Sequence, residues 1–103
     1  MDHNVISLGG VAIDDFRQIS DSFGVFRMAS TYRGDKENPL YIDVACFDGL
    51  SAIAQQYVKK GTQVSVSGRL RLNIREHEGR KFNNYSITAL SIDFSNTFSG
   101  DLT

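Results

Sequence analysis

The sequence predicts an all-β domain of five short strands and one helix, in the order β-β-β-α-β-β. Apolar and polar residues alternate with period two in the segments 40–48 and 63–75, which indicates strands with one buried face. Only the segment 50–58 places its apolar residues at the spacing of a helix. A length of 103 residues with 41% hydrophobic content suits one domain with one core. We therefore expect a small barrel-like sheet with a single helix.

The first two strands are predicted at 5–13 and 25–32. The first is apolar and β-branched, and a glycine pair in its middle allows it to bend or bulge there. The segment 14–22 is polar and is interpreted as a turn. In the second strand Phe26 and Met28 share one face, which we assign to the core.

The third strand, 40–48, has the clearest alternation. We assign Ile42, Val44 and Cys46 to its core face. The opposite face carries Tyr41, Asp43, Ala45 and Phe47. This strand therefore presents two large aromatic rings on its non-core side.

The helix that follows is short and amphipathic. Leu50, Ile53, Ala54 and Tyr57 fall at i, i+3, i+4 and i+7, and Gly61 marks its end. We expect this stripe to pack on the barrel.

The last two strands are predicted at 63–75 and 82–94, joined by a hairpin tip at 76–80. The alternation of the fifth strand slips near Leu90, as a bulge would cause. The core face of the fourth strand is assigned to Val64, Val66, Gly68, Leu70, Leu72 and Ile74.

This order of elements matches an OB-fold, a five-stranded Greek-key barrel. An SH3-like barrel is the alternative, but the helical spacing within 50–57 argues against it. We assign the domain to residues 1–94 and a short polar tail to 95–103.

Several classes of protein are disfavoured by what the sequence lacks. The single cysteine excludes an internal disulfide and a multi-cysteine zinc site. No apolar run approaches the roughly 18 residues of a membrane span, and the first residues lack the basic start of a signal peptide. His3 and His77 have no nucleophile or acid placed beside them on a rigid element. We expect a cytoplasmic, non-enzymatic protein without cofactor or metal.

The distribution of charge is more informative than its sum. The net charge is −1, but residues 59–81 carry +5 and the remainder −6. Within the basic segment Arg69, Arg71 and Arg75 share the non-core face of one strand. Such a stripe can follow a phosphate backbone, although a solvated face or protection of a sheet edge is the alternative.

The two exposed aromatic residues of the third strand favour the first of these interpretations. Nucleobases stack on aromatic rings, whereas the alternatives are a subunit interface or a small second core. Rings beside arginines are what single-stranded nucleic acid requires, and no recognition helix for a duplex is visible. The predicted interface comprises Tyr32, Arg33, Tyr41, Phe47, Arg69, Arg71, Arg75, Arg80 and Lys81.

The sequence also resembles the bacterial-type single-stranded DNA-binding proteins, over residues 4 to 94. The opening strand Asn4-Val5-Ile6-Ser7-Leu8-Gly9 resembles that of the family. The most recognisable block of the family resembles Phe47-Asp48-Gly49-Leu50-Ser51-Ala52, Tyr57-Val58-Lys59-Lys60-Gly61-Thr62-Gln63-Val64 and Gly68-Arg69-Leu70-Arg71. Its last strand resembles Ile87-Thr88-Ala89-Leu90-Ser91-Ile92-Asp93-Phe94. The resemblance implies an OB-fold that binds single-stranded DNA, with stacking at Tyr41, Phe47 and Tyr32 or a neighbour.

This chain departs from the family in three ways. It has no tryptophan, which the family commonly uses for stacking, and the family aromatic at the end of the fourth strand aligns with Ile74 or Arg75. Residues 95–103 contain one acid instead of an acidic tip, so we expect a tailless or trimmed member, such as a phage or plasmid protein, without partner docking through a tip.

The resemblance also implies a homo-oligomer, with a tetramer favoured over a dimer. Two other functions stay open. The first is a primosome-accessory OB domain that mainly docks other proteins, and the second, which we rank last, is a small hydrolase.

Overall fold

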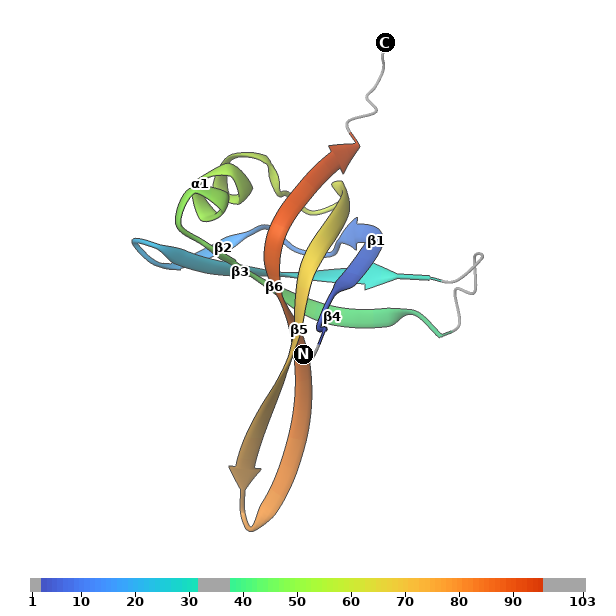
Figure 1. Ribbon diagram of the computed structural model, residues 1–103, viewed down its shortest axis with the longest axis vertical. Helices are drawn as coiled ribbons and strands as arrows, with labels where there is room; N and C mark the ends of the chain where they lie inside the picture. Colours follow the sequence, from blue (N-terminus) through green and yellow to red (C-terminus); the bar gives the residue numbers. More distant parts are fainter. Residues whose placement is uncertain (1–2, 32–37, 96–103) are drawn as a thin grey trace.

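The computed structural model describes residues 3–31 and 38–95, which form six strands and one helix (Figure 1). In chain order these are β1 (Ile6–Ala12), β2 (Arg17–Ser20), β3 (Phe23–Ser30), β4 (Leu40–Phe47), α1 (Asp48–Tyr57), β5 (Gln63–His77) and β6 (Arg80–Ser95). The strands form one sheet in the order β1-β5-β6-β4-β3-β2, and a further pairing of β1 with β3 closes it. The predicted all-β OB-fold with one helix is confirmed.

The sequence analysis missed β2, which lies inside the segment interpreted as a turn. All four of its residues are exposed, so they carry no alternation of apolar and polar residues. β2 pairs with β3, with a register shift between Gln18 and Ser20. Phe16, just before β2, is buried, and its ring centroid lies 6.4 Å from that of Phe26.

The core lies inside the closed sheet, and its largest fully buried side chains come from β3, β4, β5, β6 and the end of α1. Ile42, Val44 and Cys46 of β4 are all buried, which confirms the predicted core face of that strand. The other buried apolar residues are Ala12, Phe16, Phe26, Met28, Ala54, Val58, Val64, Val66, Ile87 and Ala89.

The packing face of α1 differs from the predicted stripe. Ser51 and Ala54 are buried against the barrel, whereas Ile53 and Tyr57 are 45% and 48% exposed. Two small residues on one face allow the helix to pack closely on the sheet. The Ser51 hydroxyl donates a hydrogen bond to Oε1 of Gln18, at 3.2 Å. The buried hydroxyl thus has a partner on β2.

The glycine pair of β1 allows a close approach between strands at Gly10. A Cβ atom at this position would collide with the backbone carbonyl of Ala29 on β3. The missing side chain therefore allows β1 to pair with β5 and also to reach β3 through Val11 and Ala12.

The predicted slip in the last strand is a β-bulge. Ser67 pairs with Ser91, but the next residue, Gly68, pairs with Ala89. Leu90 is the extra residue and is 65% exposed. The slip seen in the sequence is therefore confirmed at the expected position.

The outer part of the β5–β6 hairpin, residues 72–85, extends away from the other strands (Figure 1). We call it the distal hairpin. Leu72 and Ile74 are 48% and 61% exposed here, so the prediction that they belong to the core was wrong. Their alternation is correct, but none of the residues that the structure describes forms a second layer over that face. At the tip, Glu78 and Gly79 both have positive φ, 53° and 76°, as in a type I′ turn.

Candidate nucleic-acid interface

The non-core side of β4 is exposed, as predicted. Tyr41 and Phe47 are 50% and 41% exposed, and the side chain of Asp43 between them is 54% exposed. At about 3.3 Å of rise per residue, the two rings are roughly 20 Å apart along the strand.

Strand register brings residues of three further strands onto this side. Phe23 and Arg27 of β3 pair with Phe47 and Asp43, and Ser86 of β6 pairs with Asp43. Arg71 of β5 pairs in turn with Ser86. We call this surface the outer face. It comprises Phe23, Arg27, Tyr41, Asp43, Phe47, Arg71, Asn73 and Ser86.

One hollow of the outer face joins an aromatic pair to a cation. The rings of Phe23 and Phe47 are stacked, with centroids 4.8 Å apart and planes at 28°. A hollow of about 270 Å³, the upper groove, is lined by both rings, Arg71 and Thr88. The Thr88 hydroxyl is buried and has no hydrogen-bond partner among the described residues. The upper groove therefore offers a π-face and a positive charge together, and the Asp43 carboxylate is also part of its lining.

A second hollow lies where β4 and β6 separate. The pairing of these parallel strands ends at Asp43 and Ser86. Beyond that point a hollow of about 260 Å³, the notch, opens between them. Its lining includes Arg27, Tyr41, Asp43, Asn83, Asn84 and Tyr85. The notch thus brings the Tyr41 ring together with an acid and a cation on the outer face, and Asn83, Asn84 and Tyr85 of β6 border it.

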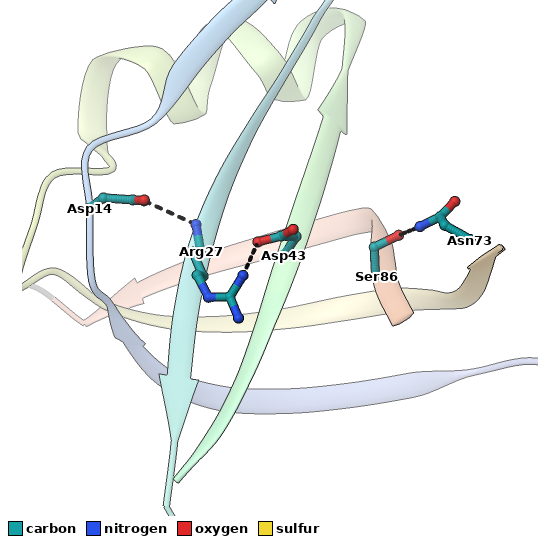
Figure 2. Close-up of polar contacts among 5 residues, drawn as sticks. All are labelled: Asp14, Arg27, Asp43, Asn73 and Ser86. Carbon is teal, nitrogen blue, oxygen red and sulfur yellow. Dashed lines mark hydrogen bonds and ion pairs between the residues drawn. The ribbon is translucent and has the colours of Figure 1, made fainter. Parts of the chain in front are cut away.

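An ion pair crosses the outer face beside the notch (Figure 2). Nη1 of Arg27 lies 3.2 Å from Oδ1 of Asp43, and the guanidinium carbon lies 5.8 Å from the ring centroid of Tyr41. The backbone N–H of Arg27 donates to the carboxylate of Asp14, at 3.0 Å. Asn73 Nδ2 donates to the Ser86 hydroxyl, also at 3.0 Å.

Asp14 and Asp15 begin the polar segment that was interpreted from the sequence as a turn, and both carboxylates accept structural hydrogen bonds. Asp14 accepts from β3, and Asp15 Oδ1 accepts from the backbone N–H of Lys60 at 2.7 Å. The two acids therefore fix the loop between β1 and β2 against β3 and the segment after α1.

The distal hairpin adds an aromatic residue that the sequence analysis missed. Phe82 is 47% exposed and pairs with Arg75 across the ladder. Both line a hollow of about 320 Å³ together with His77 and Asn84. The register therefore places the ring of Phe82 directly opposite Arg75 on the neighbouring strand.

The remaining predicted residues occupy different parts of this surface. Arg69 and Arg71 are exposed on the β5 side of the outer face, and Arg80 and Lys81 are exposed at the hairpin tip. Tyr32 and Arg33 lie outside the described residues. The structure therefore brings Phe47 and Arg71 into one hollow and places Tyr41 and Arg75 in separate hollows.

Phe23, Arg27 and Phe82 were not identified as candidates from the sequence. Phe23 and Arg27 needed the β3–β4 register, which alternation alone does not provide. Phe82 had a usable signal: a two-residue turn at Glu78-Gly79 pairs it with Arg75 by symmetry.

Other chemistry has little support in the described part of the chain. No group of three or more His, Cys, Asp or Glu residues there is placed to hold a metal ion. Burial raises the pKa of the Cys46 thiol to about 12, so the thiol is protonated at neutral pH. Among the described residues, no helix is long and apolar enough to cross a membrane.

Comparison with known proteins identifies one family. Its model, the single-strand binding protein family, matches residues 16–95. A single-stranded DNA-binding protein of Wolinella succinogenes is 38% identical over 53 residues, which are 50% of this chain and 33% of that protein. The matched segment thus spans about a third of that relative's length.

Two solved structures share the fold. A small single-stranded DNA-binding protein from Streptomyces coelicolor superposes with a TM-score of 0.76 at 25% identity, over 92% of this chain and 96% of its own. The second such protein of Mycobacterium smegmatis superposes with a TM-score of 0.71 at 23% identity, over 95% and 94% of the two chains.

Proposed function

This chain belongs to the single-strand binding protein family, and on that premise we propose that it binds single-stranded DNA. Its role would be to coat and protect exposed strands, with little overall sequence preference, during replication, recombination or repair. The function is one of binding, with no chemical step. We place it in the bacterial cytoplasm at the nucleoid, or on phage or plasmid DNA.

One observation carries the proposal: aromatic rings and arginines from four strands share the outer face and the distal hairpin. Unpaired bases stack on exposed rings, and each stacked base contributes about 1–3 kcal/mol. Cations beside the rings neutralise the phosphates that connect those bases. A duplex hides the faces of its bases and would use neither the stacked pair nor the notch.

Each hollow has a distinct role in this proposal. Phe47, supported by Phe23, stacks one base in the upper groove while Arg71 binds a phosphate beside it. Tyr41 stacks a second base at the notch. On the distal hairpin, Phe82 takes the place of the aromatic residue that the family carries at the position of Ile74 or Arg75. Arg69, Arg75, Arg80 and Lys81 provide further phosphate contacts.

We also propose that the chain works as a homo-oligomer, with a tetramer favoured. A tetramer would present several outer faces to one strand, so that binding to the first face raises the effective concentration for the next. Sedimentation with and without a long oligothymidine would establish the number of copies.

Titration of a labelled oligothymidine at several salt concentrations tests the function. We expect tight binding at low salt, and log affinity that falls with log salt by about 0.7 per neutralised phosphate. A duplex of equal length should bind much more weakly. Absence of binding at low salt would overturn the proposal, and so would an affinity that does not change with salt, as expected of a protein-docking module.

A further inference from the structure

The notch has the components of a site that reads a base edge, in addition to stacking the base. Building on the proposed function, we propose that among pyrimidines it selects cytosine, through its exocyclic amino group, over uracil or thymine. The protein would then coat DNA broadly while this one position prefers cytosine.

The notch fits a flat ring. Tyr41 of β4 is 50% exposed and shares the outer face with Arg27 and Asp43, so its ring is available to a base on that side. Tyr85 of β6 borders the same hollow, but it is next to Ser86 and therefore lies on the opposite face of its strand. Because β4 and β6 stop pairing at Asp43 and Ser86, the space between the two strands is not filled by a ladder. Single-stranded bases are recognised in this way, with the ring against aromatic side chains and the edge against polar groups.

The polar lining presents an acceptor beside a donor. The Asp43 carboxylate can only accept hydrogen bonds, and the Arg27 guanidinium can only donate them. They are fixed next to each other by the 3.2 Å contact, in which Arg27 uses Nη1 and Asp43 uses Oδ1. Both side chains remain about half exposed, so a base can still reach them.

The Watson–Crick edge of cytosine complements this pair. Its amino group donates to Asp43, and its ring nitrogen and carbonyl oxygen accept from Arg27. Uracil and thymine have a carbonyl oxygen where cytosine has the amino group, so the carboxylate would face another acceptor. The amides of Asn83 and Asn84 line the same hollow and can bond to either base. Discrimination therefore depends on Asp43.

The same carboxylate opposes a phosphate at this position. A phosphodiester placed over Asp43 would meet a like charge, and Arg27 is already paired. The cations proposed for phosphates lie on β5 and at the hairpin tip instead. The bound strand is therefore expected to turn a base, not its backbone, toward the notch.

The test compares oligodeoxycytidine with oligodeoxyuridine of equal length by fluorescence anisotropy at one salt concentration. These probes differ at the base edge but not by a methyl group. We expect the native chain to bind the cytidine oligomer roughly fivefold more tightly, the lower end of what one base-edge hydrogen-bond pair provides. Asp43→Asn and Asp43→Ala remove the carboxylate. They should lower the ratio of the two affinities to the value that base stacking alone gives.

Asp93→Asn is the matched control, because it removes one exposed negative charge from the far part of β6. It should leave the ratio unchanged. If Asp43→Asn has the same ratio as the native chain, or raises both affinities equally, the base-reading site is wrong and Asp43 only repels DNA. If neither oligomer binds the native chain, the proposed function fails and this inference fails with it.

Discussion

The two halves of the β5–β6 ladder have the same sequence pattern and opposite surroundings. In the half inside the barrel, Val66 and Ile87 are fully buried. In the distal hairpin, Leu72 and Ile74 continue the same alternation but are 48% and 61% exposed. β1 and β4 pair only with the barrel half. Alternation therefore identifies the faces of a strand, whereas burial depends on a second layer.

The largest effect expected from this comparison concerns stability. Ile87→Ala should lower the free energy of unfolding by about 2–5 kcal/mol, because it leaves a cavity in the closed core. Ile74→Ala makes the same chemical change in the same ladder and should cost under about 0.5 kcal/mol. Urea unfolding followed by circular dichroism measures both. Equal losses would show that the distal hairpin is covered in solution.

The next effect separates the outer face from other exposed aromatic residues. Phe47→Ala should weaken binding of oligothymidine by about 1–3 kcal/mol, because a stacked base loses its partner. Tyr57→Ala, at the end of α1, removes a ring of similar exposure that lies away from the outer face. It should leave affinity unchanged. A collapse of thermal stability in Phe47→Ala would mean that its ring is mainly structural.

Phe82 tests whether the distal hairpin serves binding although it contributes little to the core. Phe82→Ala should reduce oligothymidine affinity by about 1 kcal/mol, the lower end for a base stacked on one ring. Ile74→Ala is the control, since its neighbour Arg75 rather than Ile74 pairs with Phe82. Anisotropy titrations compare the two variants. If Phe82→Ala binds oligothymidine as tightly as Ile74→Ala does, the distal hairpin is not part of the interface.

A smaller effect is expected from a single cation. Arg71→Ala should reduce the steepness of log affinity against log salt by about 0.7, the contribution of one phosphate on a single strand. Lys59→Ala removes an exposed charge just after α1 and should not change the slope. Identical slopes for all three proteins would indicate that Arg71 does not contact a phosphate.

A further prediction concerns the buried thiol of Cys46. Alkylation requires the thiolate, and burial raises the pKa of this thiol to about 12. The folded protein should therefore resist iodoacetamide at pH 8, whereas the urea-unfolded protein should react at the ordinary rate. Mass spectrometry gives the modified fraction. Rapid labelling of the folded protein would show that β4 opens readily.

The sequence predicted most of the fold because the barrel strands alternate and the helix interrupts them. It also placed Tyr41 and Phe47 correctly outside the core, since one strand is enough to assign a face. It missed β2, whose residues are all exposed, and the buried Ser51, which is polar. β2 forms through backbone pairing with the adjacent β3, which no side-chain pattern reveals, and the partner of Ser51 is Gln18, which is distant in sequence.

The candidate interface was only partly accessible from the sequence. The arginine stripe and the two rings of β4 each lie on one strand, so spacing revealed them. Phe23, Arg27 and Phe82 enter through register across strands, and the Arg27–Asp43 contact depends on pairing between β3 and β4. Asp43 was assigned to the correct face. Its ion pair with Arg27, on which its proposed role depends, could not be read from the spacing of residues.

The strand pairings that close the barrel differ greatly in length. Between β4 and β6 only three residue pairs are in register, Asp43 with Ser86, Val44 with Ile87 and Ala45 with Thr88. Amide protons along this short join are expected to exchange with solvent sooner than those of the long β5–β6 ladder. A DNA strand that contacts Phe47 on one side and Arg71 on the other spans the join. Binding should therefore slow this exchange. The bound DNA would then stabilise the pairing of β4 with β6 as well as being held by it.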